Sequence, residues 1–443
     1  MSLFSNLSIN KTKGIVNINV VSWTKLLNKG GSWSSGDQLS SFWKGAEPQF
    51  RPIQFDRQQF LHRQQLTEDY EWDCETLDES IQKLPCHELH EENKAVFTQY
   101  SGFHVPICYE NQELRNEVLD TRACGSIYDA SYKRQFLLIG KDSSKFLDAL
   151  VTSDIESLEE WQSVKTLMTN HNGGIIDELL VSKRTKEKLH IVANRPKVLT
   201  EVQNHLKSFE GDVSFQIAEE KCYLTFQGPE CSTFLKTVFN NIENLRYMHN
   251  KEFDGAFITR CSTTGDDGYS ISCKEGISLV NSLKKGYNKQ EVNFISLKAK
   301  QCLTIEAGMC SSGVDFDENT TPVEADLTDL ISKRKKKNGG FPGSEVILKQ
   351  LRSKPSKIRK GFISEDAWLL KGGKVMSPKG EVVGEITSST YSPCITTYIG
   401  MGYVSTSYCM ESEELLFRNK KKGRLHKIPF VPNGILCNRM TNE

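Results

Sequence analysis

The chain has 443 residues, with 56 lysines and arginines balanced by 56 aspartates and glutamates. This length exceeds the size at which a single hydrophobic core stops growing, so we expect two or three domains. A net charge of zero excludes a global attraction to nucleic acid or to an anionic membrane, and the longest apolar runs are too short to span a bilayer. The sequence therefore predicts a soluble protein whose charged ligands are held by a local site.

Cysteine and histidine spacing gives no metal site. The 13 cysteines are scattered from Cys74 to Cys437 without a CxxC pair, which argues against a disulfide framework or structural zinc and favours a reducing compartment. His87 and His90 in HELHEE lack the HExxH spacing that brings two imidazoles to one helical face. We interpret HELHEE as the exposed start of a helix, and we expect no metal.

The N-terminal region divides into two parts. Residues 1–36 contain four lysines and no acidic residue, and apolar residues recur at helical spacing, so we interpret this stretch as a mitochondrial transit segment. A disordered tail is the alternative. Residues 37–84 are polar, without a sustained apolar period, and we expect a poorly folded extension there.

From residue 85 onward, β-like runs alternate with helical patterns, which is typical of an α+β protein. The strand candidates are RQFLLIG, LHIVAN, CYLTFQG and GAFITRC, and the helix candidates are SSKFLDALV, CSTFLKTVFNNI and GISLVNSLKKGY.

A basic, glycine-rich break, KRKKKNGG at residues 333–340, predicts a solvated surface loop. We therefore expect a core of two interleaved α+β domains over residues 85–340 and a second region over 341–443. From about Arg359 that second region has short strands separated by turn residues, the pattern of a small β-barrel.

Motifs spread over four fifths of the chain resemble the T-protein of the glycine cleavage system, a family of folate-dependent aminomethyltransferases. In order they are LHEENKAVFTQYSGFHVPICY, IYDASY, SDI, LMTNHNGGIIDELLV, LTFQGPE, TRCSTTGDDGYSIS, LTIEAGMCSSGVDFDENTTPVEADL, FPG, SPCITTYIGMGYV and KIPFVP.

The resemblance implies a three-domain cloverleaf that binds folate, ending in a small β-barrel. It also implies a reaction. The aminomethyl carbon carried by the lipoyl arm of a partner, the H-protein, passes to tetrahydrofolate, with release of ammonia and formation of 5,10-methylenetetrahydrofolate. No nucleic acid partner and no membrane insertion are expected.

Asp154 occupies the position of the family's catalytic aspartate. Loss of ammonia and attack by a folate nitrogen both move protons, so a carboxylate beside the reacting nitrogens is useful. The alternative is structural, because Ser153 or Asp154 could cap a helix or fix a turn. The resemblance favours the acid–base and orienting role.

The resemblance also implies a set of ligand-binding candidates. Asn170 has an amide that can both donate and accept hydrogen bonds. Gln227 lies in the QGP turn, which would form a pocket wall, and Arg260 is the second residue of the TRCSTTGDDGYSIS motif. Asp129 occupies a motif position near the ligand, although we favour a structural role for it over a catalytic one.

Several positions depart from the family pattern. Thr263 stands where the family has tyrosine, and Ser270 where it has a glutamate for the pterin end of folate. One hydroxyl cannot replace a carboxylate that accepts two hydrogen bonds, and a lost charged hydrogen bond costs ~1.5–3 kcal/mol. Lys300 keeps the charge of a ligand-side arginine without its planar fork, and Thr304 loses a second arginine.

The alternative to a weakened pterin site is that a neighbouring residue replaces the missing glutamate. Asp266 or Tyr269, for example, could do so after a small register change. The leading hypothesis is an active aminomethyltransferase. A second is a non-catalytic scaffold that keeps the fold and binds folate weakly. A related iron–sulfur assembly factor would carry a KGCYxGQE-like motif that this sequence lacks, and a demethylase on the same fold stays open.

Overall fold

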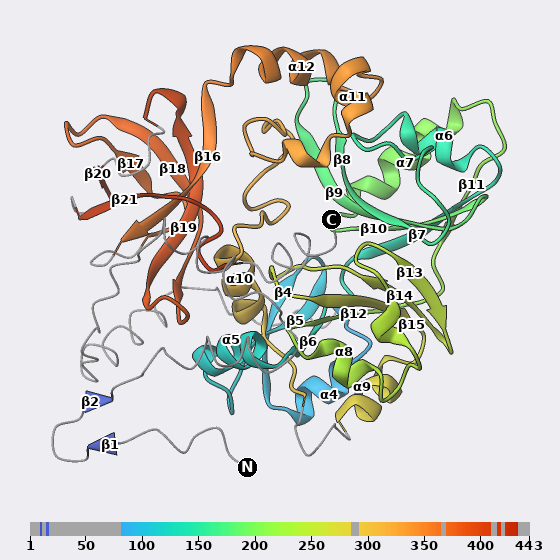
Figure 1. Cartoon of the computed structure of the whole chain (residues 1–443), viewed down its shortest axis with the longest axis horizontal. Coiled ribbons are helices and arrows are strands. Elements are labelled where there is room, and N and C mark those ends of the chain that lie inside the picture. Colours follow the sequence, from blue (N-terminus) through green and yellow to red (C-terminus); the bar gives the residue numbers. More distant parts are fainter. Residues whose placement is uncertain are drawn as a thin grey trace, which may run out of the picture. The chain divides into compact units, whose positions relative to one another are not determined.

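The structure is a computed structural model that describes the strand residues Ile9–Asn10 and Ile15–Val16 and residues 81–284, 292–364, 369–408, 414–417 and 421–432. The chain separates into two units, Met1–Cys74 and Glu75–Glu443. In the first unit the described residues form an antiparallel pair, β1 (Ile9–Asn10) with β2 (Ile15–Val16). Most of the predicted transit segment and most of the predicted polar extension lie outside the described residues. All that follows concerns the second unit (Figure 1).

One five-stranded antiparallel sheet has the order β11-β7-β10-β9-β8. Its strands are β7 (Arg134–Ile139), β8 (Ser163–Thr169), β9 (Ile175–Thr185), β10 (Lys188–Ala193) and β11 (Ser214–Ile217). The apolar runs predicted as strands at RQFLLIG and LHIVAN form β7 and β10. Two helices, α6 (Ser143–Asp148) and α7 (Lys197–Lys207), flank the sheet. Val198 and Val202, one helical turn apart, bury the apolar face of α7 in the core of this sheet.

A second five-stranded sheet has the order β13-β14-β15-β12-β6. Its strands are β6 (Ser126–Asp129), β12 (Cys222–Gln227), β13 (Asn250–Phe253), β14 (Ala256–Arg260) and β15 (Gly268–Cys273). The helices α8 (Cys231–Leu235), α9 (Gly276–Lys284) and the short helix η1 (Ile242–Asn244) contribute side chains to its core. Every residue of β12 and of β15 is buried.

A three-stranded sheet, in the order β3-β5-β4, begins the described core. It comprises β3 (Gln82–Lys83), β4 (Ala95–Tyr100) and β5 (Phe103–Tyr109), with α4 (His87–Glu92) between the first two strands. The helix α5 (Leu114–Ala123) follows β5.

The C-terminal part is a closed barrel in the order β16-β19-β18-β17-β20-β21. Its strands are β16 (Lys357–Ser364), β17 (Lys374–Met376), β18 (Val382–Ser392), β19 (Thr397–Ser405), β20 (Glu414–Leu416) and β21 (Lys422–His426). A short helix, η3 (Thr406–Tyr408), follows β19. Together with the two sheets, the barrel confirms the predicted α+β cloverleaf with a small C-terminal β-barrel.

Helix α10 (Leu297–Glu306) contacts α5 and the barrel strands β18 and β19 (Figure 1). The Ser296 side chain accepts a hydrogen bond from the backbone N–H of Ala299 and so caps its N-terminus. Along the chain, α10 and the first barrel strand are separated by η2 (Thr328–Leu330), α11 (Lys333–Asn338) and α12 (Ser344–Ser353). Within the described residues, no helix is both long and apolar enough to cross a bilayer.

Two local predictions were wrong. KRKKKNGG does not form a loop, because Lys333–Asn338 is the helix α11, with Ser332 as its cap. Lys335 in this run is only 1% exposed, since its ammonium group pairs with Asp148. HELHEE is helical as predicted, but His87 and His90 are buried. The sequence pattern could not reveal partners that lie far along the chain.

Candidate functional site

Asp154 lies in the segment between α6 and β8, and an arginine from α11 holds its side chain. Nε of Arg334 is 2.6 Å from Oδ2 of Asp154, and Nη2 is 3.0 Å from Oδ1. The N–H of Ser157 donates to Oδ1 at 3.2 Å. Hydrogen bonding from Arg334 lowers the pKa of Asp154, so its carboxylate is ionised at neutral pH. With a side chain 20% exposed, it is a fixed and accessible anion.

Helix α11 is anchored through a second carboxylate. Nη2 of Arg334 also donates to Oδ1 of Asp148 at 2.6 Å, and Nζ of Lys335 lies 2.8 Å from Oδ2 of the same residue. Arg334 therefore bridges Asp148 and Asp154, so its guanidinium is fixed at both ends. The sequence offered no local signal for this arrangement, because Arg334 lies 180 positions after Asp154 and 186 after Asp148.

The backbone beside Asp154 is tied to β8. The N–H of Ser153 donates to Oγ1 of Thr166 at 2.9 Å, and its hydroxyl donates to the carbonyl of Lys165 at 3.2 Å. Asn170 directly follows this strand. Its Oδ1 accepts from the N–H groups of Asn172 and Gly174, and its Nδ2 donates to the carbonyl of Glu318. The amide of Asn170 thus shapes the β8–β9 turn.

Gln227 holds the loop that follows β14. Its Oε1 accepts from the N–H of Thr263 at 2.9 Å, and its Nε2 donates to the carbonyl of Cys261 at 3.3 Å. The hydroxyl of Thr304 on α10 donates to the carbonyl of Thr263 at 3.4 Å. Gln227, Thr263 and α10, which carries Lys300, are therefore brought together around this loop.

Arg260 and Asp129 make structural contacts. Nε of Arg260 donates to Oδ1 of Asp267 at 2.9 Å, and Nη1 donates to the carbonyl of Leu245 at 2.8 Å. Asp129 is 2% exposed. It accepts from the N–H of Ser131 at 3.0 Å and lies 3.3 Å from Nε2 of His90. Through Asp267, Arg260 holds the C-terminal end of the loop that follows β14.

Ser270 is buried in β15, opposite Thr225 of β12 and Thr259 of β14. Its hydroxyl lies 3.1 Å from Sγ of Cys261 and also bonds to Tyr223.

The two neighbours that could compensate for Ser270 are already engaged. The carboxylate of Asp266 pairs with Arg122, and the hydroxyl of Tyr269 lies 2.6 Å from Oγ of Ser232. Both side chains therefore have partners within the protein.

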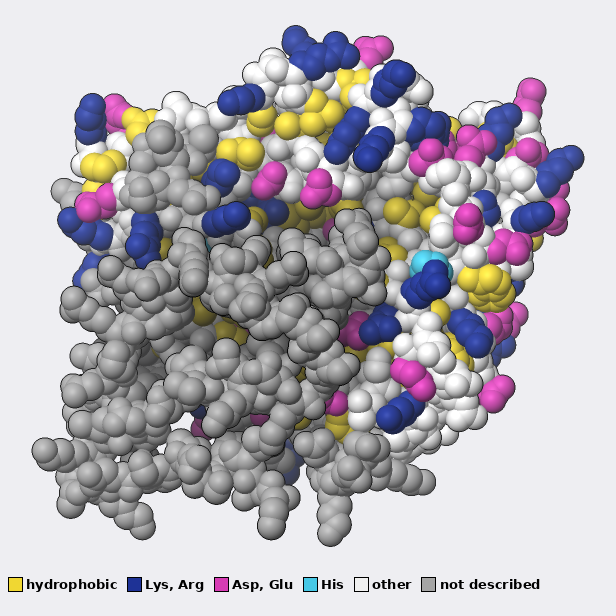
Figure 2. Space-filling model, viewed as in Figure 1, with side chains coloured by type: hydrophobic (Ala, Val, Ile, Leu, Met, Phe, Trp, Pro, Cys, Tyr) yellow, Lys and Arg dark blue, Asp and Glu magenta, His cyan; other side chains and the backbone are white. Residues whose placement is uncertain are grey.

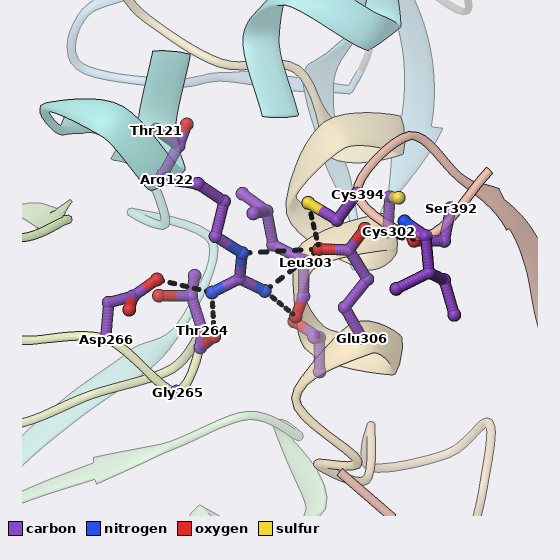
Figure 3. A network of polar contacts seen from close by, with 12 residues as sticks. Thr121, Arg122, Thr264, Gly265, Asp266, Cys302, Leu303, Glu306, Ser392 and Cys394 are labelled. Carbon is purple, nitrogen blue, oxygen red and sulfur yellow. Dashed lines mark hydrogen bonds and ion pairs between the residues drawn. The ribbon is translucent and has the colours of Figure 1, made fainter. Parts of the chain in front are cut away.

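A buried ionic network, which the sequence did not reveal, links α5, the Thr263 loop, α10 and the barrel (Figure 3). Arg122 donates to the carbonyls of Thr264 at 2.7 Å and Leu303 at 3.2 Å, and to Glu306 at 3.0 Å. Its fourth acceptor is Asp266. Glu306, fully buried, also accepts at 2.6 Å from the hydroxyl of Ser392 at the end of β18.

The sequence analysis also did not identify three charged side chains beside the Thr263 loop. Lys133 lies between β6 and β7, Lys165 on β8 and Glu178 on β9. Nζ of Lys165 donates to the carbonyl of Ser262 at 3.0 Å and lies 3.5 Å from Oε1 of Glu178. The sequence did contain a signal for Lys165 and Glu178. Each is a charged residue inside a largely apolar strand pattern, SVKTLMT and IIDELLV. Within the described residues, no cluster of His, Cys, Asp and Glu could hold a metal ion.

Comparison with known proteins agrees with this architecture. The sequence matches the family models described as "GCVT N-terminal domain" over residues 86–335 and "Glycine cleavage T-protein C-terminal barrel domain" over residues 359–431. A Solanum tuberosum protein named "Aminomethyltransferase, mitochondrial" is 34% identical over 377 residues, covering 81% of this chain and 92% of the relative. A Mus musculus protein of the same name is 31% identical over 369 residues, covering 80% and 90%.

A solved structure of a glycine cleavage system protein also matches this chain. The crystal structure of glycine cleavage system aminomethyltransferase T from Bartonella henselae matches with a TM-score of 0.74 at 28% sequence identity, covering 80% of this chain and 99% of that one. The matches extend over both the α+β core and the barrel. The chain therefore belongs to the glycine cleavage T-protein family, the aminomethyltransferases.

Proposed function

We propose that this protein is a tetrahydrofolate-dependent aminomethyltransferase of the glycine cleavage system. It would move the aminomethyl carbon from lipoyl H-protein to tetrahydrofolate and release ammonia. The observation that carries the proposal is family membership over the whole core and barrel, together with an ionised, anchored carboxylate at Asp154.

The proton balance of the reaction explains why a carboxylate is needed. The transferred carbon leaves one sulfur and one nitrogen and forms bonds to two folate nitrogens. Each folate nitrogen loses a proton, and the two protons end on ammonia and on the lipoyl thiol. Asp154 is ionised at neutral pH and therefore has a carboxylate oxygen that can accept a proton, and the Arg334 pair fixes the direction of its oxygens.

The fit to tetrahydrofolate is uneven along the ligand. At the reacting end, Asp154 supplies the accessible carboxylate that the chemistry uses. At the pterin end, the Ser270 hydroxyl is already bonded to Tyr223 and lies against Cys261. The carboxylate of Glu178, whose side chain is 23% exposed, could accept hydrogen bonds from a pterin edge instead.

The partner in this proposal is a lipoylated H-protein, which binds transiently because its lipoyl arm must enter and leave. Helix α11 offers a docking surface: Lys333 and Lys337 are exposed, whereas Lys335 is buried in its pair with Asp148. Basic side chains gather around α11 and α12 at the top of Figure 2. Such a patch would steer an acidic carrier electrostatically.

We also propose a mitochondrial location. The relatives from Solanum tuberosum and Mus musculus carry the word mitochondrial in their names, and residues 1–36 have the composition of a transit segment. A fusion of residues 1–36 to a fluorescent reporter should enter mitochondria. Fluorescence confined to the cytosol would contradict this part of the proposal.

A second candidate function, a non-catalytic scaffold with a weakened folate site, is favoured by the buried contacts of Ser270. A calorimetric titration with tetrahydrofolate at sub-millimolar concentration separates the two candidates. Measurable binding supports the enzyme. Absence of binding by the wild-type protein, together with tighter binding by Ser270→Glu, would support the scaffold.

A further inference from the structure

Three cysteine thiols from separate segments meet in the core of the second five-stranded sheet. Cys86 directly precedes α4, Cys222 begins β12 and Cys273 ends β15. Cys222 and Cys273 lie opposite one another in the register of these two strands. All three thiols are free, and each of the three residues is 3% exposed or less.

Cys222 lies at the centre of this thiol cluster. Its Sγ is 3.9 Å from Sγ of Cys86, which is 136 positions away along the chain, and it also hydrogen bonds to the thiol of Cys273. The first residue of α9, Gly276, leaves room for the sulfurs, because a Cβ there would overlap Sγ of Cys222. The two residues between Cys273 and Gly276 are exposed, so the chain reaches the surface directly beside the cluster.

A proton acceptor lies next to Cys222. A hydrogen bond from Cys273 lowers the pKa of the Cys222 thiol, but its bond to Cys86 and its burial outweigh this effect and raise that pKa overall. Such a thiol stays protonated unless a base accepts its proton. Oγ of Ser131 lies 3.8 Å from Sγ of Cys222 and is hydrogen bonded to the carboxylate of Asp129. Ser131 therefore connects the thiol to a carboxylate.

Two further buried side chains hold Asp129 in place. Its Oδ2 lies 3.3 Å from Nε2 of His90, and Nδ1 of the same imidazole is 3.0 Å from the hydroxyl of Tyr109. These contacts leave Oδ1, the oxygen that Ser131 contacts, on the side of the thiol cluster. A proton can thus pass from Cys222 through the Ser131 hydroxyl to Asp129 without movement of the backbone.

We propose that Cys86 and Cys222 form a reversible disulfide when the protein meets a peroxide. A disulfide brings the two Cβ atoms to about 3.8 Å. Directly opposite residues of antiparallel strands, such as Cys222 and Cys273, keep their Cβ atoms ~4.5–5.5 Å apart. Cys86 lies outside the strands, in the segment before α4, and can approach Cys222 without disturbing the sheet. The proposal does not rest on the proposed function.

The oxidation consumes one peroxide and releases two waters. Asp129 takes the thiol proton of Cys222 through Ser131, and the sulfur attacks one peroxide oxygen, which breaks the O–O bond and leaves a sulfenic acid. The departing hydroxide recovers the proton from Asp129 and becomes water. The sulfur of Cys86 then attacks that of Cys222, the S–O bond breaks, and the second hydroxide leaves with the Cys86 proton. Two electrons pass from the sulfurs to the peroxide.

Mass spectrometry of the full chain identifies the product. The folded, reduced protein is treated with hydrogen peroxide, the remaining thiols are blocked with iodoacetamide, and trypsin is added without a reductant. Cys86 lies on the tryptic peptide of residues 84–94, Cys222 on 222–236 and Cys273 on 261–274. We expect peptide 84–94 joined to peptide 222–236 at Cys222, and separation of the two by dithiothreitol. A link between Cys222 and Cys273, or no link, would overturn the proposal.

Cys231→Ser is the matched control. Cys231 is fully buried in the same core and shares the tryptic peptide of Cys222. We expect this variant to form the disulfide as fast as the wild type, and loss of the link would show that Cys231 is the oxidised residue instead. Cys86→Ser should stop at the sulfenic acid of Cys222, which dimedone labels. Absence of dimedone from folded Cys86→Ser would contradict the reaction sequence, and the wild-type map decides if this variant does not fold.

Ser131 variants test the proton path. Ser131→Ala should slow disulfide formation by about 100-fold, the range of a lost acid–base group, and its rate should rise with pH as solvent hydroxide replaces the path. Ser131→Thr keeps a hydroxyl and should retain the wild-type rate. A purely structural role would change the melting temperature but not the pH dependence of the rate. If Ser131→Ala reacts with the rate and pH profile of the wild type, the proton path is wrong.

Discussion

Replacing Arg122 by methionine should destabilise the protein strongly, because Arg122 joins three segments in the buried network. Its guanidinium donates to two carbonyls and pairs with Asp266 and Glu306. The Arg122 side chain is 3% exposed and that of Glu306 is fully buried, so solvent cannot replace the lost partner. Removing one partner of a buried ion pair costs ~3–5 kcal/mol, a large share of the ~5–15 kcal/mol that stabilises a typical domain.

The free energy of unfolding, measured by urea titration, gives the assay. Arg195→Met is the matched control: Arg195 lies 3.6 Å from Glu318 with 32% of its side chain exposed, and such a pair contributes about 1 kcal/mol or less. The double variant Arg122→Met, Glu306→Gln should recover part of the loss, because it removes the unpaired carboxylate. The reasoning is refuted if Arg122→Met costs no more than Arg195→Met.

Burial raises the pKa of Glu117 from its usual 4.5 to about 7, because the folded protein favours the neutral, protonated side chain. The stability that this protonation contributes is fully present below pH 4.5 and is lost as the pH rises through 7. Glu117→Gln should therefore melt higher relative to wild type at pH 8 than at pH 5, and a constant difference in melting temperature would contradict this. Arg334→Met should return the pKa of Asp154, followed by NMR titration, towards its ordinary range, because the hydrogen bond from Arg334 is the main cause of its depression. No change in that pKa would show that the pair is not formed in solution. The exposed Lys333 and Lys337 predict that association with an acidic carrier slows as salt is added, and a salt-independent rate in stopped-flow experiments would exclude this docking surface.

The sequence predicted most of the fold because local patterns determined it. The apolar run at β7 and the short strands of the barrel, such as KIRKGFIS at β16, carry the signals of strand formation in neighbouring residues. The folate-family motifs then gave the order of the domains. Both kinds of evidence are contained in short stretches of chain.

The site could be predicted only in part, because its contacts join distant residues. Arg122 and Glu306 are 184 positions apart, and Asp154 and Arg334 are 180 positions apart. The sequence around one residue of each pair therefore does not identify its partner. KRKKK was expected to be solvated because charge runs usually are. Lys333 and Lys337 are exposed in the structure, but the run is helical, Arg334 pairs with Asp148 and Asp154, and Lys335 is buried in its pair with Asp148.

The most direct test of the central claim is a transfer assay with the full chain, aminomethyl-lipoyl H-protein and tetrahydrofolate, in which ammonia and 5,10-methylenetetrahydrofolate are both measured. We expect the two products in equal amounts, and about 100-fold slower turnover by Asp154→Asn at an unchanged melting temperature, because the amide cannot accept the proton. Folded wild-type protein that forms neither product, or an Asp154→Asn variant as fast as wild type, would contradict the account.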